Sequence, residues 1–269
     1  MDDYRIYIAF HREGKLLAKD DIYTPLHVGW KNSMLDLNMQ NDATGNNISA
    51  SNEIYSELTG WYWIWQNRNH DYIGTGHYRR YFTAQQPSYI HKYSKLLLYL
   101  IGLKKKRHGM FYVKDDLRWQ EKILSRKEIQ SFMHDYDAIL PEKKQFKYSV
   151  YEQYKRRHKE SDLLLTRKII EEKYPSYLTA FDEVIKSQQM YSFNMFIMPW
   201  HLFDEYMSWL FDVLFELEER SDIDRDDKYQ KRVCAFMAER LQTVWFQKKQ
   251  LKVKELPILY FKKLKTEHF

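Results

Sequence analysis

The chain has 269 residues, of which 44% are hydrophobic, and it lacks any Pro/Gly/Ser-rich linker, so we expect residues 1–269 to form a single folded domain. Its one cysteine, Cys234, excludes an internal disulfide and a cysteine-rich zinc site. The formal net charge of +6 favours anionic partners, but it does not choose between nucleic acid, a membrane surface and a nucleotide.

The first elements along the chain are a strand, a loop and a helix. Residues 4–10 alternate between two sets of apolar side chains, which predicts a strand that ends in a loop at residues 11–14. Turn-forming residues fill positions 41–47, and a helix is expected to begin near Ser49, with Asn47 or Ser49 as its N-cap. Residues 71–76 predict a second strand, whose two glycines allow another group to approach the backbone closely.

Residues 92–125 form a basic, partly apolar excursion. An apolar run at 96–103 precedes four cations at 104–107, and it is too short to cross a bilayer. It fits either peripheral contact with the inner membrane or a core helix that ends in a solvated basic cap. Because the N-terminus lacks a signal-peptide pattern, we expect a cytoplasmic protein.

Strands and helices alternate again in the second half. The patterns predict strands at 136–141 and 193–198, and helices at 149–173, 176–186, after Pro199, and at 226–248. This alternation predicts an α/β fold.

A dense group of polar residues follows the strand at 71–76. Open α/β sheets bind ligands at the carboxyl ends of their strands, and a guanidinium matches phosphate oxygens bidentately. If this segment stays extended, Arg79 and Arg80 face opposite sides and at least one faces the cleft, where it could hold a diphosphate. The ordinary alternative is that both arginines pair with carboxylates or lie in solvent.

Three further groups could contribute to a site, and each has a structural alternative. The helix start at 42–49 could bind an anion or a hydroxyl, or simply cap the helix. Glu239 could be a general base, or the ion-pair partner of Arg232 or Arg240. His158 and Asp162 share one helix face, which by default is a solvated face.

Metal sites are not indicated. Asp135 and Asp137 stand just before and at the start of the predicted strand at 136–141, whereas a divalent ion in a nucleotide-sugar enzyme is often held at the end of a strand. The acidic residues at 222–226 lack the glycine and the glutamate that a calcium loop needs. No phosphate-binding loop and no dinucleotide-binding fingerprint is present.

Several motifs occur in a familiar order. They are Asp42-Ala43-Thr44-Gly45-Asn46-Asn47-Ile48-Ser49, Glu57-Leu58-Thr59-Gly60-Trp61-Tyr62-Trp63, Gly76-His77-Tyr78-Arg79-Arg80-Tyr81-Phe82, Asn194-Met195-Phe196, Trp209-Leu210-Phe211 and Glu239-Arg240-Leu241. With them the chain resembles a bacterial family long labelled a domain of unknown function. Members of that family occur in capsular and exopolysaccharide gene clusters, and some are galactofuranosyltransferases.

This resemblance implies a glycosyltransferase A-like single domain with a central mixed sheet flanked by helices and a helical C-terminal part. It implies transfer of a sugar, plausibly galactofuranose, from a UDP-sugar donor to a polysaccharide or lipid-linked glycan. Because the arginines stand where related folds hold a metal, we expect no divalent metal cofactor. The donor would be bound by His77, Tyr78, Arg79, Arg80, Asp42, Thr44, Asn47 and Asn194, and the acceptor by Tyr154 and His158. Glu239 is the first choice of base and Asp162 the second.

Two other classes of function remain open. A phosphoryl-transfer enzyme would use His77 as its nucleophile, and a non-catalytic protein would bind glycans or nucleotides through its aromatic side chains. Nucleic acid is the least favoured partner, because the basic residues are dispersed rather than interleaved with aromatic ones.

Overall fold

The computed structural model describes residues 2–86, 109–115, 117–224, 226–227 and 229–262. Within these residues nine strands form one mixed sheet. Seven of them lie side by side in the order β10 (Val253–Leu256), β6 (Ala138–Pro141), β9 (Ile197–Pro199), β3 (Tyr72–His77), β4 (Arg80–Phe82), β11 (Ile258–Phe261) and β5 (Met110–Val113). The other two are β1 (Tyr4–Phe10), which pairs in parallel with β3, and β2 (Tyr23–His27), which pairs in parallel with β1. The prediction of an α/β fold with a central mixed sheet is confirmed.

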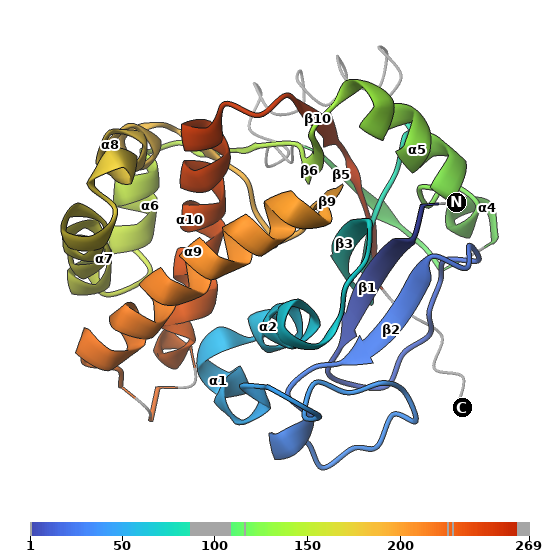
Figure 1. The fold of residues 1–269 in the computed structure, drawn as a ribbon, viewed down its shortest axis with the longest axis horizontal. Coiled ribbons are helices and arrows are strands. Elements are labelled where there is room, and N and C mark those ends of the chain that lie inside the picture. Colours follow the sequence, from blue (N-terminus) through green and yellow to red (C-terminus); the bar gives the residue numbers. More distant parts are fainter. Residues whose placement is uncertain (1, 87–108, 116, 225, 228, 263–269) are drawn as a thin grey trace.

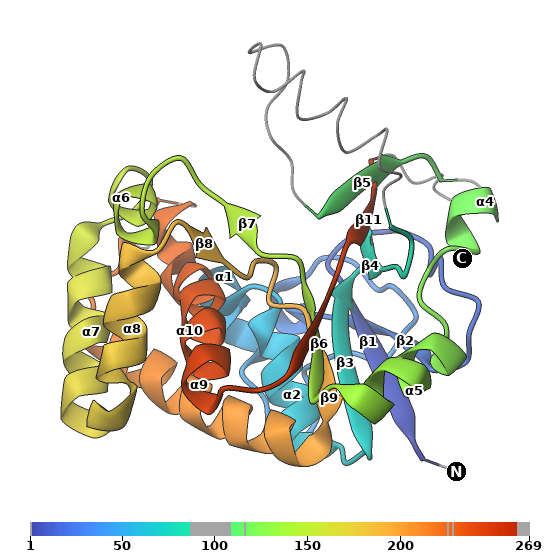
Figure 2. The same cartoon turned by 90° about the horizontal axis from the view of Figure 1, so that it is seen from above.

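Helices cover both faces of the sheet (Figures 1 and 2). On one side are α2 (Leu58–Asn67), α9 (Trp200–Arg220) and α10 (Val233–Lys249), with α6 (Val150–Lys155), α7 (Glu160–Lys173) and α8 (Leu178–Lys186) beyond them. On the other side are α4 (Leu117–Gln120) and α5 (Arg126–Asp135). A short second sheet joins β7 (Lys144–Gln145) to β8 (Gln189–Met190).

The predicted strand at residues 4–10 shows why the sheet is central. Its alternating side chains belong to two apolar cores. Tyr7 and Ala9 belong to the core that contains α2, α9 and α10, whereas Ile6 and Ile8 belong to the core on the side of α5. Both sets are almost fully buried. A strand with two apolar faces therefore has to lie between two layers of helices.

The two glycines of β3 allow it to lie close to its neighbours. A Cβ on Gly74 would lie 3.0 Å from the side chains of Ile6 and Ile197, and a Cβ on Gly76 would lie 2.6 Å from Ile8 Cδ1. The close approach expected from the sequence is therefore that of the apolar side chains on β1 and β9.

Four predicted elements are divided or shortened in the structure. The helix expected from Ser49 onward is a 3₁₀ turn, a short α1 (Asn52–Tyr55) and then α2, with a break at Ser56 (φ 51°, ψ −131°). The helix expected at 149–173 is divided into α6 and α7, and the last long helix begins at Val233 rather than near residue 226. The strand expected at 193–198 begins only at Ile197, because Phe193 (φ 80°) and Asn194 (φ 49°) are left-handed.

The sequence did not indicate the strands β2, β10 and β11 or the helix α5. The chain after α10 returns to the sheet, so the expected helical C-terminal part is followed by two strands. The described part of the excursion at 92–125 includes β5 and α4, whereas the apolar run and the cations at 96–107 lie outside the described residues.

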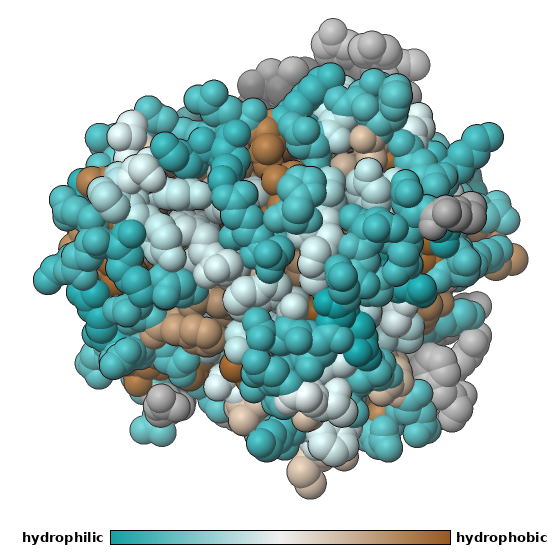
Figure 3. Space-filling view, in the orientation of Figure 1, coloured by the Kyte–Doolittle hydropathy of each residue, from teal (hydrophilic) through white to brown (hydrophobic). Residues whose placement is uncertain are grey.

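Within the described residues no helix is long and apolar enough to cross a bilayer. On the face shown in Figure 3, hydrophobic side chains are scattered among hydrophilic ones.

Candidate functional site

The segment that follows β3 is a tight hairpin. His77 pairs with Arg80, so the chain reverses at Tyr78 and Arg79. Tyr78 is 2% exposed and donates its backbone N–H to the carbonyl of Ala9 (3.1 Å). The expectation of an extended segment with alternating faces is therefore wrong, because β4 turns back from β3 and pairs with β11.

Four arginines meet at this edge of the sheet, and we call them the arginine cluster: Arg12, Arg79, Arg80 and Arg232. Arg12 follows the carboxyl end of β1, Arg79 and Arg80 belong to the hairpin, and Arg232 precedes α10. The guanidinium groups of Arg12 and Arg79 both lie over the Tyr78 ring (6.0 and 5.1 Å from its centroid), and those of Arg79 and Arg80 both lie over the Tyr260 ring (5.5 and 5.9 Å). After desolvation, the charges of all four arginines lower the pKa of His11. In Figure 2, β1 and β3 run from the N-terminal side toward β4 and β11, where this edge lies.

The positive charges of the arginine cluster are not balanced by carboxylates. Within the described part of the chain, no carboxylate oxygen lies within ion-pair distance of any of the four. The Arg79 guanidinium instead lies over the rings of Tyr78 (5.1 Å) and Tyr260 (5.5 Å), and that of Arg80 over Phe193 (4.7 Å). The Nε atoms of Arg79 and Arg80 are buried without a hydrogen-bond partner. Guanidinium groups arranged in this way can bind an anion such as a phosphate.

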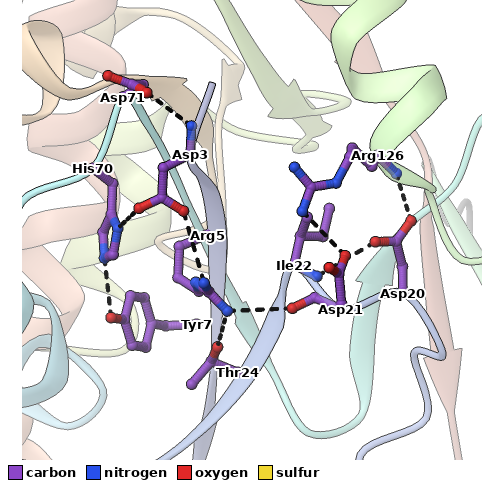
Figure 4. A network of polar contacts seen from close by, with 10 residues as sticks. All are labelled: Asp3, Arg5, Tyr7, Asp20, Asp21, Ile22, Thr24, His70, Asp71 and Arg126. Atoms are coloured by element: carbon purple, nitrogen blue, oxygen red, sulfur yellow. Dashed lines mark hydrogen bonds and ion pairs between the residues drawn. The ribbon is translucent and has the colours of Figure 1, made fainter. Parts of the chain in front are cut away.

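The opposite edge of the same sheet is built differently (Figure 4). There the Arg5 guanidinium lies 3.7 Å from a carboxylate oxygen of Asp3, and Arg126 lies 3.1 Å from one of Asp21. His70 also bonds to Asp3 (2.6 Å). These cations near the amino ends of the strands are therefore paired with carboxylates. The arginines at the carboxyl ends of the strands differ from them in having no carboxylate partner among the described residues.

Two histidines lie among these arginines and stay neutral. The rings of His11 and His77 are 5.6 Å apart. Burial and the charges of Arg80 and Arg79 hold the pKa of His77 well below its usual range. Desolvation and Arg12 lower the pKa of His11 to about 4. Because Nδ1 of His77 accepts the backbone N–H of Arg79 (3.3 Å), its Nε2 carries the proton and can donate to a ligand.

Acidification is expected to destabilise the fold through these histidines. Below pH 6.5 the unfolded chain binds a proton on His77 that the folded chain excludes, so the free energy of unfolding falls by at most about 1.4 kcal/mol per pH unit for each such histidine. Urea unfolding at pH 7.5 and 5.5 measures this loss. The loss should be smaller in His77→Gln and unchanged in His201→Gln, which alters an exposed histidine of α9. An equal loss in wild type and His77→Gln would contradict the interpretation.

Glu239 lies at this edge and contacts the left-handed residues before β9. Its Oε1 accepts the backbone N–H of Phe193 (2.8 Å), and its Oε2 lies 3.6 Å from Nη1 of Arg240. Asn194 is 3% exposed, and its Nδ2 donates to Oε1 of Glu57 (2.9 Å). The structure thus brings Glu239 and Asn194 together beside the arginine cluster, since the Phe193 ring faces Arg80.

The side chain of Asp42 connects the loop at 42–47 to neighbouring segments. Asp42 is fully buried, and its carboxylate accepts hydrogen bonds from the backbone of Gly29 and Trp30 and from the hydroxyls of Ser49 and Thr59. A direct contact between Asp42 and a donor would require breaking one of these bonds. Neither predicted residue is the N-cap: the 3₁₀ turn begins at Ser49 itself, after Ile48. Asn47 lies just before it, and its Oδ1 accepts the backbone N–H of Ser49 (3.3 Å).

Thr44 and Asn47 lie in the same loop. Thr44 is exposed and receives the indole N–H of Trp63, on its carbonyl (2.8 Å) and on its hydroxyl (3.1 Å). Asn47 Nδ2 donates to the carbonyls of Ala43 (3.1 Å) and Gly45 (2.9 Å). Their contact with a donor stays a prediction.

The residues predicted for the acceptor lie in the helical half. Tyr154 is fully buried, and His158 packs against Tyr229 and Phe236. Phe236 in turn faces Arg232 (5.3 Å), so His158 is connected to the arginine cluster through one aromatic side chain. Burial and Arg240 lower the pKa of His158 to about 4.

Asp162 is not brought to the sheet edge. It lies in the first turn of α7, where it accepts a hydrogen bond from the Ser221 hydroxyl (2.6 Å), and burial raises the pKa of its carboxyl group. In Figure 1, α7 lies on the outer side of the helical layer, away from β3. Among the described residues, no group of three or more His, Cys, Asp and Glu side chains is placed to hold a metal ion.

Other members of the site were not indicated by the sequence patterns. Desolvation lowers the pKa of the Lys144 amine, and the nearby charge of Glu239 raises it. The charges of Arg157, Arg240 and Arg80 also lower this pKa. His11 and Arg12 could have been found, because they follow a predicted strand just as the hairpin does. Lys144 and Glu57 carry no comparable local signal.

Comparisons with known proteins bear on the fold and the family of this chain. The structure is similar to that of WbbM, a bifunctional glycosyltransferase solved in its apo form, with a TM-score of 0.86 and 29% sequence identity. The match covers 98% of this chain and 46% of that one, so the chain spans about half the length of WbbM. A search of curated protein sequences found no match. A family described as a domain of unknown function (DUF4422) matches residues 5–250, and the chain belongs to this family.

Proposed function

We propose that this chain transfers a sugar from a nucleoside-diphosphate donor to a glycan acceptor, and that the arginine cluster holds the diphosphate in place of a metal ion. The observation that carries the proposal is the set of unpaired arginines at the carboxyl edge of the sheet. The likeness to a bifunctional glycosyltransferase supports glycosyl transfer as the reaction class.

Each group at the edge has a use in such a transfer. Arg79 and Arg80 would bind the phosphate oxygens and stabilise the negative charge that develops as the sugar leaves. The neutral His77 would donate from Nε2 to the donor, and Asn194 would contact its sugar. The proposed donor is a UDP-sugar, plausibly UDP-galactofuranose, and the proposed acceptor is a capsular, exopolysaccharide or lipid-linked glycan.

Nucleotide binding tests the proposal directly. UDP and a panel of nucleotide sugars are added to the purified protein with and without excess chelator, because a ligand that binds only the folded state raises the melting temperature. We expect UDP to raise the melting temperature equally in both conditions, and Arg79→Ala to lose the effect.

Other outcomes would contradict parts of the proposal. A shift that chelator abolishes and manganese restores would contradict metal independence. The absence of any shift would favour a glycan-binding protein without nucleotide chemistry. An acid-labile phosphate on His77 would indicate phosphoryl transfer instead.

A further inference from the structure

Glu57 lies directly after a break between the helices α1 and α2. The preceding residue, Ser56, has φ 51° and ψ −131°, a strained conformation for a residue with a side chain. Its neighbours hold it there: Asn52 Nδ2 donates to the Ser56 carbonyl (2.7 Å), and Arg232 Nε donates to the Ser56 hydroxyl (2.9 Å). The break therefore ties Glu57 to one member of the arginine cluster.

A second strained segment meets Glu57 from the other side. Phe193 and Asn194 are consecutive left-handed residues, and each is held by a carboxylate from a different helix. Glu239 of α10 accepts the Phe193 N–H, and Glu57 at the start of α2 accepts from Asn194 Nδ2. Strain that is held from two sides in this way is characteristic of functional sites.

This segment places Glu57 close to the donor site. The carbonyl of Asn194 accepts the Thr75 hydroxyl (3.1 Å), and Thr75 lies on the same face of β3 as His77, two residues or about 7 Å away. The ring of Phe193 lies against Arg80. Glu57 is thus connected to the arginine cluster in two ways. Its neighbour Ser56 contacts Arg232, and its partner Asn194 is followed back along the chain by Phe193, which contacts Arg80.

The two carboxylates differ in what their second oxygen contacts. Oε2 of Glu239 lies 3.6 Å from the guanidinium of Arg240, a cation that is 3% exposed. Oε2 of Glu57 has neither a hydrogen-bond donor nor a cation partner among the described residues, and Glu57 is half-buried rather than enclosed. A carboxylate oxygen without a partner can accept the proton of a bound hydroxyl without losing another contact, so Glu57 is the better placed of the two to act on an acceptor.

We propose that Glu57, rather than Glu239, is the general base of the sugar transfer, an inference that rests on the proposed function. Oε2 of Glu57 takes the proton of the acceptor hydroxyl as its oxygen forms the new bond to the anomeric carbon. The bond from that carbon to the diphosphate breaks, and its electron pair leaves with the nucleoside diphosphate onto the arginine cluster. This single displacement inverts the anomeric configuration of the donor.

The test compares Glu57→Gln with Glu239→Gln. A glutamine at 57 can still accept from Asn194 Nδ2 but cannot take a proton, so kcat should fall on the order of 100- to 10,000-fold while the donor KM and the UDP-induced rise in melting temperature stay unchanged. Glu239→Gln retains the bond to Phe193 and should lose less than about 10-fold in kcat. Glu57→Asp, which keeps a carboxylate, should retain more turnover than Glu57→Gln.

Three results would overturn the inference: turnover near wild type in Glu57→Gln, a larger loss in Glu239→Gln than in Glu57→Gln, or a product with retained anomeric configuration by NMR. The UDP-induced shift in each variant reports whether it is folded. If the wild-type protein neither binds UDP nor transfers a sugar, the proposed function itself fails, and this outcome is distinct from the three above.

Discussion

Replacing Arg80 with alanine is expected to lower kcat/KM for sugar transfer about 100- to 1,000-fold, the usual cost of removing one group that stabilises a developing anion. The guanidinium of Arg80 has no carboxylate partner in the described structure and lies against Phe193, beside the proposed base. Arg80→Lys should recover only part of the loss, because an ammonium keeps the charge but lacks the two-pronged geometry. Steady-state kinetics with varied donor concentrations measure both variants.

The matched control for this experiment is Arg68→Ala. Arg68 also lies over an aromatic ring, at 4.3 Å from that of Trp63, but it follows the carboxyl end of α2 and is not part of the arginine cluster. Its replacement should leave kcat/KM within about twofold of wild type. If Arg80→Ala and Arg68→Ala behave alike, the role of the arginine cluster in binding the diphosphate is refuted.

Replacing Asp42 with alanine is expected to lower the free energy of unfolding by at least about 3 kcal/mol, because four donors lose their acceptor and each unsatisfied buried donor costs about 1–3 kcal/mol. Two of these donors are backbone N–H groups of Gly29 and Trp30, and two are the hydroxyls of Ser49 and Thr59. The bonds join the loop after β2 to α2. Chemical denaturation measures the change.

Asp36→Ala is the control for the same loop. Asp36 is exposed, and among the described residues it accepts only the backbone N–H of Asn38, so the change should be within about 0.5 kcal/mol of wild type. If Asp42→Ala is as stable as Asp36→Ala but weakens UDP binding, the donor contact predicted from the sequence would be favoured over the bracing role.

The fold was predictable where local patterns agree with long-range packing. The alternation over residues 4–10 is a strand because both of its faces have a core to fill. The pattern from Ile54 to Trp65 predicts one helix, yet Ser56 breaks it, because Asn52 and Arg232 stabilise a conformation that helical periodicity cannot signal. The strand expected at 193–198 is shortened for a similar reason, since two carboxylates distant in sequence hold its first residues.

The candidate site was only partly predictable. The rule that ligands bind at the carboxyl ends of strands correctly directs attention to Arg79 and Arg80. Arg232, Lys144 and Glu57 join them from other elements, and their proximity depends on how those elements pack. A side chain that contributes through tertiary packing has no periodic signature in its own segment.

The strand β11 completes the hairpin at Tyr78 and Arg79, although it is synthesised long after it. Phe261 donates its backbone N–H to the carbonyl of Arg79 (2.9 Å), and Tyr260 pairs with Arg80. These residues leave the ribosome long after the hairpin does, and such non-local pairings form late because loop closure is costly. A growing chain can therefore form the β1–β3 pairing well before its hairpin is completed, so that the proposed donor site would form only after β11 has been synthesised.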